Sequence, residues 1–319
     1  MQKISSTFGI IATVIILGLI LIVVKNRGLI FEGANLEDLK IGSKYILYYK
    51  KACELNDKKA CLELGNIYKN GYRGVSIDHK RAVEFYKKAC DLNSPIACNN
   101  LAYIYNLNQE NRLAFKYYKK ACKLNSLIGC YNLGSMYYYG EGTKRSRYKA
   151  KVLFEMVCKN GIGAGCNDLG YMYAHGIYVK RDILKALSLY SDACQYGQGS
   201  ACGNLGILYS KGALGVSKDR VKAEQYFSIA CKLNDLESCD RLQSIRDITT
   251  VEDFNIAKRI CDRGVKSGCY RLGELYTKDN IFVKKDIKKA LEYFRKACNL
   301  GQNLACRRVG DYYKIQDNL

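Results

Sequence analysis

The sequence predicts an all-α solenoid in which pairs of helices stack along the chain. Three observations favour this fold class: paired cysteines recur at a nearly constant interval, a pattern of Leu, Gly and Tyr follows most of the pairs, and only one of the 319 residues is proline. A period of roughly 20–50 residues is typical of repeat architectures, and proline is the residue that interrupts helices most strongly. With 48% hydrophobic and 25% charged residues, the composition is that of a folded protein and excludes wholesale disorder.

The sixteen cysteines form eight pairs with seven residues between the two members, and none is left over. The pairs are Cys53 and Cys61, Cys90 and Cys98, Cys122 and Cys130, Cys158 and Cys166, Cys194 and Cys202, Cys231 and Cys239, Cys261 and Cys269, and Cys298 and Cys306. One helical pattern ends at the first cysteine and another begins near the second, which suits a disulfide between adjacent helices. The repetition favours local pairing among very many connectivities. Reduced buried cysteines and zinc ligands are the alternatives, although zinc sites favour cysteines about two to four residues apart.

Each unit is predicted to hold two helices. The first carries Leu, Gly and Tyr three, four and seven residues after the second cysteine, as in Leu64, Gly65 and Tyr68, on one helical face. Glycine at mid-helix indicates a close approach that a side chain would block. The recurring tyrosines are interpreted as core. An aspartate four residues before an alanine is predicted to be the N-cap of the second helix. These aspartates are Asp78, Asp182, Asp219, Asp253 and Asp286.

The unit Cys-x-x-Leu-Gly-x-x-Tyr, followed by a Gly-rich turn and Asp-x-x-Lys-Ala, resembles the Sel1-like repeat, a relative of the tetratricopeptide repeat. The paired cysteines are similar to those of the Helicobacter cysteine-rich protein family, and the resemblance covers residues 39–319. It implies a right-handed superhelix of about seven helix pairs, exported from the cell and crosslinked within each pair of cysteines. The second repeat departs from the pattern with Ala102 for Gly, and the sixth with Gln243 for Gly and Arg246 for Tyr.

Residues 1–29 are predicted to be a membrane anchor or a signal sequence. Phe8–Val24 is an uncharged run of 17 residues between Lys3 and Lys25, and a spanning helix needs about 17–25. The absence of a small-x-small site after it favours an uncleaved anchor. Residues 30–38 are interpreted as a linker and 39–319 as the solenoid. Because so many thiols would be a liability in a reducing cytosol, we expect the repeats outside the cytoplasm: periplasmic, inner-membrane anchored, or secreted if the leader is cleaved.

The sequence predicts no catalytic residue, metal ligand or cofactor. Ser146 and Lys149 form one Ser-x-x-Lys, but the Ser-Asp-Asn and Lys-Thr-Gly sequences of serine β-lactamases are absent. The two histidines, His79 and His175, are placed in inter-helix turns and are too few for a metal site. The resemblance nevertheless implies an alternative function, because the Helicobacter cysteine-rich proteins are described as penicillin-binding proteins with weak β-lactamase activity.

The main functional hypothesis is an exported or membrane-anchored scaffold that binds a protein or a cell-envelope ligand in its groove. Residues 1–30 hold only three basic residues, so most of the net charge of +21 lies over the repeats and attracts anionic partners. Nucleic acid is not expected outside the cytoplasm. Four tyrosines outside the repeat pattern are the candidate binding surface: Tyr138, Tyr139, Tyr178 and Tyr190. The ligand, the binding face and the oligomeric state stay open.

Overall fold

The computed structural model describes residues 36–72, 74–245, 248 and 250–316. The chain divides into two compact units, Met1–Leu124 and Asn125–Leu319. The predicted membrane segment, Phe8–Val24, lies outside the described residues. Among the residues that are described, no helix combines the length and the apolar character that a bilayer crossing requires.

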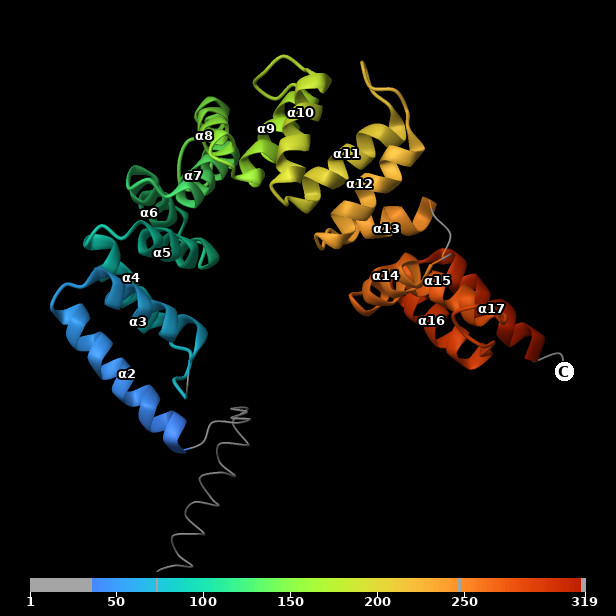
Figure 1. Cartoon of the computed structure of the whole chain (residues 1–319), viewed down its shortest axis with the longest axis horizontal. Helices are drawn as coiled ribbons and strands as arrows, with labels where there is room; N and C mark the ends of the chain where they lie inside the picture. The colour runs from blue at the N-terminus through green and yellow to red at the C-terminus, as the bar shows by residue number, and fades with distance from the viewer. Residues whose placement is uncertain (1–35, 73, 246–247, 249, 317–319) are drawn as a thin grey trace, which may run out of the picture. The chain divides into compact units, whose positions relative to one another are not determined.

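Both units consist of helices in the parts that the structure describes, and the predicted all-α solenoid is confirmed (Figure 1). The first unit contains α2 (Leu36–Glu54), α3 (Lys58–Asn70), α4 (His79–Asp91), α5 (Pro95–Leu107) and α6 (Asn111–Lys123). The second contains α7 (Leu127–Tyr139), α8 (Arg147–Lys159), α9 (Gly163–His175), α10 (Ile183–Gln195), α11 (Gly199–Lys211), α12 (Arg220–Lys232), α13 (Leu236–Ile245), α14 (Val251–Asp262), α15 (Lys266–Tyr276), α16 (Ile287–Asn299) and α17 (Asn303–Gln316).

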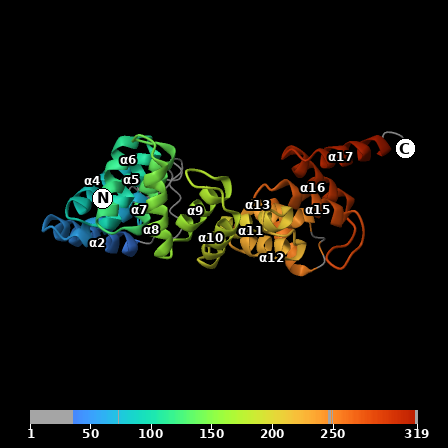
Figure 2. The same cartoon turned by 90° about the horizontal axis from the view of Figure 1, so that it is seen from above.

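Consecutive helices pack on one another within each unit. We call the odd-numbered helices α3 to α15 the first helices of their repeats, and the even-numbered helices α4 to α16 the second helices. Each first helix packs on the second helix of its own repeat, and most second helices also pack on the next first helix. The last helix, α17, packs on α16 at the end of the second unit (Figure 2). Such nearest-neighbour packing defines a solenoid.

The cysteine pairs lie at the turns between repeats, as predicted. Seven pairs have Cα–Cα distances of 4.6–4.8 Å, and Cys122 and Cys130 are disulfide-bonded as well. The third residue after each first cysteine is Asn or Gly with φ between +59° and +84°. These residues are Asn56, Asn93, Asn125, Gly161, Gly197, Asn234, Gly264 and Gly301. Asn and Gly adopt this left-handed conformation most readily, so the turn brings the two cysteines together.

A second recurring arrangement joins the two helices of a repeat. In the fifth repeat, Asp219 caps α12 by accepting a hydrogen bond of 2.9 Å from the backbone N–H of Lys222. The amine of Lys222 lies over the ring of Tyr209, 5.3 Å from its centroid, and that ring stacks on Tyr226 at 5.6 Å. One lysine therefore contributes to both the helix cap and a cation–π contact.

The same arrangement occurs in other repeats. Asp78, Asp182 and Asp286 are N-caps, as predicted. The residues three positions later lie over the repeat tyrosines: Arg81 over Tyr68, Lys185 over Tyr173 and Lys289 over Tyr276. These contacts explain why a basic residue and a tyrosine recur together, and they confirm that the recurring tyrosines belong to the repeat packing.

The recurring glycine of the first helix faces an aromatic ring of the second. A Cβ atom on Gly206 would lie 2.6 Å from ring atoms of Phe227, and one on Gly273 would lie 2.6 Å from Phe294. Both rings are buried. Because ordinary carbon contacts are about 3.5–4.0 Å, a side chain at these positions would displace the ring. The predicted close approach is confirmed.

The sixth repeat has different residues at the glycine and aromatic positions. Gln243 stands at the glycine position of α13 and is buried, while Ala257 stands on α14 where other repeats have the aromatic ring. The sixth repeat therefore lacks both the glycine and the aromatic ring of the repeat pattern, and α13 packs less extensively on α14 than the first helices of other repeats pack on their second helices.

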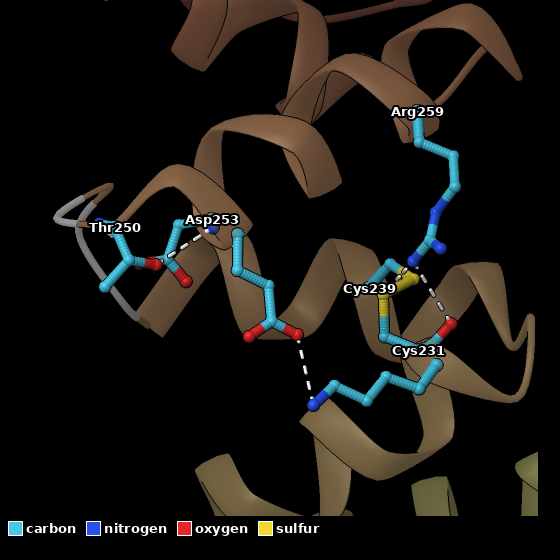
Figure 3. A network of polar contacts seen from close by, with 7 residues as sticks. Cys231, Cys239, Thr250, Asp253 and Arg259 are labelled. Atoms are coloured by element: carbon cyan, nitrogen blue, oxygen red, sulfur yellow. Dashed lines mark hydrogen bonds and ion pairs between the residues drawn. A yellow bond between two sulfur atoms is a disulfide. The ribbon is translucent and has the colours of Figure 1, made fainter. Parts of the chain in front are cut away.

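One N-cap prediction was wrong. The N-cap of α14 is Thr250, and Asp253 is the third residue of the helix, where the two form a reciprocal capping box (Figure 3). Asp253 accepts a hydrogen bond from the backbone N–H of Thr250, and Thr250 Oγ1 accepts one from that of Asp253. The spacing to alanine misled the prediction, because a Thr-x-x-Asp box places the acidic residue inside the helix. In the same region Arg259 donates to the carbonyl of Cys231 at 3.4 Å.

Candidate binding pocket

Side chains of α7, α8 and α9 enclose a pocket of about 290 Å³ in the second unit. Its lining residues are Ser135, Tyr138 and Tyr139 of α7, Phe154 of α8, and Asn167, Asp168 and Tyr171 of α9. Drug-sized ligand sites have about 300–1,000 Å³, so this volume suits a single side chain or a small group.

The aromatic residues form one wall and the rim. Phe154 is buried, with 1% of its surface exposed, whereas Tyr139 and Tyr171 are 67% and 44% exposed. The ring of Tyr138 meets that of Tyr139 edge-on at 5.0 Å and lies 6.5 Å from that of Phe154. Edge-to-face ring pairs at these separations are favourable. The pocket therefore has a fixed apolar floor and an accessible aromatic mouth.

The polar side is held by a chain of hydrogen bonds across three first helices. Tyr131 of α7 donates to Oδ2 of Asp168 at 3.1 Å, and Asn167 donates to Oδ1 at 3.2 Å. Asn204 of α11 donates in turn to Oδ1 of Asn167 at 3.0 Å. These bonds orient the carboxylate without neutralising it, since all of the donors are uncharged.

Burial dominates the electrostatics of this pocket. Desolvation raises the pKa of the Asp168 carboxyl above its ordinary value, although its hydrogen bonds from Tyr131 and Asn167 oppose the rise. Desolvation also raises the pKa of the Tyr131 hydroxyl, and the charge of Asp168 adds to that shift. The pKa of Tyr138 is raised by burial first and then by Tyr171. Burial therefore favours the neutral form of all three groups, and the hydrogen bonds from Tyr131 and Asn167 favour the carboxylate form of Asp168.

The four predicted surface tyrosines divide among three environments. Tyr138 and Tyr139 line the pocket. Tyr178 is 56% exposed in the turn between α9 and α10, where its ring lies 5.9 Å from that of Tyr148, and it does not line the pocket. Tyr190 is a correction, because its ring is 3% exposed and packs over Gly170 in the repeat core. It is the ring of α10 equivalent to Phe227.

Sequence reasoning missed Asp168 and Tyr171, which the fold brings beside Tyr138. They stand two and five residues after Cys166 on the first helix of their repeat. If successive first helices are aligned on their cysteines, these two positions lie beside the position eight residues after the cysteine of the preceding first helix, which is Tyr138. A tyrosine that departs from the repeat pattern does not by itself indicate which residues of the next repeat lie beside it.

Ser146 and Lys149 have places in the repeat rather than in a pocket with other reactive groups. Ser146 is the N-cap of α8 and accepts a hydrogen bond from the backbone N–H of Lys149 at 3.4 Å. The amine of Lys149 lies over the ring of Tyr137, 5.1 Å from its centroid. The Ser-x-x-Lys sequence thus follows from the cap and cation–π arrangement of the other repeats. The histidines lie at helix ends, His79 as the first residue of α4 and His175 as the last of α9, rather than in the turns.

The chain belongs to the Sel1 repeat family. Sel1 repeats match residues 46–57, 58–94, 95–126, 127–162, 163–197, 199–235 and 266–302. The predicted Sel1-like architecture is confirmed. The interval between the last two matched repeats contains α13 and α14, where Gln243 takes the place of the usual glycine and Ala257 that of the usual aromatic residue.

Solved structures and a curated relative show similar repeats. The chain is similar to c5321, a protective antigen of uropathogenic Escherichia coli strains that displays an SLR fold, with 26% identity, a TM-score of 0.63, and coverage of 85% of this chain and 60% of that one. A 73-residue stretch is 32% identical to cytochrome c oxidase assembly factor 7A of Xenopus laevis. That match spans 23% of this chain and 31% of the relative, less than two thirds of its length.

The similarity extends to the Helicobacter cysteine-rich proteins. Helicobacter pylori cysteine rich protein B is 34% identical along 41% of this chain and 92% of that chain, with a TM-score of 0.34. The predicted resemblance is therefore confirmed in the sequence. The disulfides of the described repeats indicate an oxidising, extracytoplasmic environment.

Proposed function

We propose that the chain is an exported or membrane-anchored adaptor that binds an extended segment of a partner protein at the pocket between α7 and α9. Sel1 repeats form protein-interaction scaffolds, and this pocket combines exposed tyrosines with a half-buried, oriented carboxylate. Tyrosine supplies a large contact area at a low cost in conformational entropy and is enriched among residues that dominate binding energy. The observation that carries the proposal is the convergence of Tyr138, Tyr139 and Tyr171 around Asp168.

Disulfides suit such an adaptor outside the cytoplasm. Each links two helices over a sequence separation of eight residues, and a loop of this size stabilises by about 2.5 kcal/mol in the chain-entropy model. A solenoid whose repeats touch only their neighbours gains from local crosslinks that oppose local opening. Periplasmic, membrane-anchored and secreted forms are all consistent with this proposal. The expectation of an anionic ligand, based on the net charge, concerns the repeats as a whole rather than this pocket.

Selection from a displayed peptide library against the full, oxidised chain tests the proposal. We expect the selected peptides to lose binding to Tyr139→Ser and Tyr171→Ser variants. The matched control is Tyr196→Ser, because Tyr196 is 54% exposed at the end of α10 and does not line the pocket. Peptides that bind all three variants as well as the parent chain would contradict the proposed site.

A further inference from the structure

The carboxylate of Asp168 lies in the pocket without a cationic partner. Within the part of the chain that the structure describes, no lysine or arginine forms an ion pair with it, and its pKa is raised by desolvation rather than lowered by a neighbouring charge. Burying a carboxylate without a cation is unfavourable. In a chain with 51 basic residues against 30 acidic ones, a nearby lysine would be a common solution.

In the first unit a lysine lies beside the corresponding tyrosine. Tyr103 stands five residues after Cys98 on α5, as Tyr171 stands five residues after Cys166 on α9. In the first unit the amine of Lys69 lies 5.5 Å from the centroid of the Tyr103 ring. Lys69 comes eight residues after Cys61 on the preceding first helix.

The pocket of the second unit has no lysine at this register. The residue eight positions after Cys130 is Tyr138, so a tyrosine replaces the lysine at that register. The Tyr171 ring instead stacks on that of His175, with 4.1 Å between the centroids. The residue at offset two has changed as well, from Asn100 on α5 to Asp168 on α9. The pocket therefore gained a carboxylate and an aromatic ring where the first unit has an amide and a lysine.

We infer that the pocket between α7 and α9 binds the cationic side chain of a lysine or arginine on the partner segment, between the tyrosine rings and the Asp168 carboxylate. This inference rests on the proposed function and deepens it. A cation over tyrosine faces is attracted by the ring quadrupole, more strongly when it is desolvated. The carboxylate adds a charge-assisted hydrogen bond. Both Asp168 oxygens keep acceptor capacity beyond the bond that each already receives.

The lining residues favour an organic cation over a metal ion. Calcium and magnesium require several oxygen ligands, whereas Asp168 is the single carboxylate in the lining, and the described residues contain no group of three or more potential metal ligands. The volume of about 290 Å³ fits one side chain. The aromatic rim contacts the methylene stem, as amphipathic side chains require.

Titration of the full, oxidised chain with small probes tests the inference. The probes are N-acetyl-lysine methylamide, N-acetyl-arginine methylamide and the neutral N-acetyl-norleucine methylamide, with binding followed through tyrosine-ring resonances. We expect the lysine or arginine probe to bind about ten- to a hundredfold more tightly than norleucine, as charge-assisted hydrogen bonds allow. Asp168→Asn should remove this preference, and the control Asp192→Asn, at an exposed carboxylate of α10, should retain it.

A second variant keeps the test decisive if Asp168→Asn folds poorly. Tyr171→Leu preserves an apolar rim without the π face and should also reduce the preference for the cationic probes. Equal binding of all three probes, or an unchanged preference in folded Asp168→Asn, would overturn the inference. If the cation inference fails but the library peptides still require Tyr139 and Tyr171, the chain binds peptides at this pocket without selecting a cationic side chain, and the proposed function stands. If those peptides ignore the pocket, the proposed function fails, whatever the small probes show.

Discussion

The glycine at the centre of most first helices can be replaced by alanine to distinguish helix propensity from a close approach, because the two predict opposite effects. Replacing glycine by alanine in a helix interior stabilises by about 1 kcal/mol through propensity alone. At Gly206, however, the new Cβ would lie 2.6 Å from Phe227, whose side chain is 2% exposed and surrounded by the core. Overpacking of this kind costs about 1–3 kcal/mol. Gly206→Ala is therefore expected to be neutral or destabilising by up to about 2 kcal/mol.

Gly310 is the matched control, because it holds the same repeat position on α17 and no atom lies within 4 Å of its added Cβ. Gly310→Ala should stabilise its helix by about 1 kcal/mol. Since solenoids open locally, hydrogen exchange of peptides from α11, α12 and α17 is the appropriate assay. Equal stabilisation by both substitutions would refute the close-approach argument and leave propensity as the whole effect.

Three further predictions follow from the same contacts. Ser146→Ala should destabilise α8 by about 1 kcal/mol in thermal unfolding, and Ser146→Asp should restore the lost stability, because aspartate is also a good N-cap. If the parent chain hydrolysed a chromogenic β-lactam and a well-folded Ser146→Asp variant did not, Ser146 would instead be a nucleophile. Joint replacement of Cys194 and Cys202 by alanine should cost about 2.5 kcal/mol and accelerate hydrogen exchange in α10 and α11, with unchanged exchange contradicting the stabilising role of the link. Because its folded-state pKa is raised, Asp168 takes up a proton before the unfolded chain does as the pH falls. Its own contribution to stability should therefore increase over that interval, while binding of the lysine probe weakens. The tyrosines that face it are Tyr131 and Tyr138 on α7 and Tyr190 on α10; their pKa values are raised, so they stay protonated as the pH falls. An unfolding titration and a binding titration over the same pH range measure the two trends, and tighter probe binding at low pH would contradict the second.

Local rules predicted most of the fold. The constant cysteine spacing located the turns, the aspartate caps located the starts of four second helices, and glycine marked the close approach to an aromatic ring. The rules failed where two residues changed together. Gln243 departs from the glycine pattern in one helix, and Ala257 departs from the aromatic pattern in the next. Asp253 matches the cap pattern, but the N-cap is Thr250, three residues earlier.

The candidate pocket was predicted only in part, because it depends on register between repeats. Tyr138 and Tyr139 were identified as tyrosines outside the repeat pattern, which is a property of one helix. Asp168 and Tyr171 become relevant only through their position beside α7, a long-range relationship that composition does not contain. Tyr190 also looked irregular, yet it is the core ring that closes over Gly170.

The crosslinking of each pair of neighbouring cysteines is best tested by mass-spectrometric disulfide mapping. The native chain is digested without reduction after its free thiols are blocked. We expect eight crosslinked peptides, each joining cysteines eight positions apart, and no blocked thiol. Links between cysteines of distant repeats, or blocked thiols throughout the chain, would contradict both the architecture and the oxidising environment.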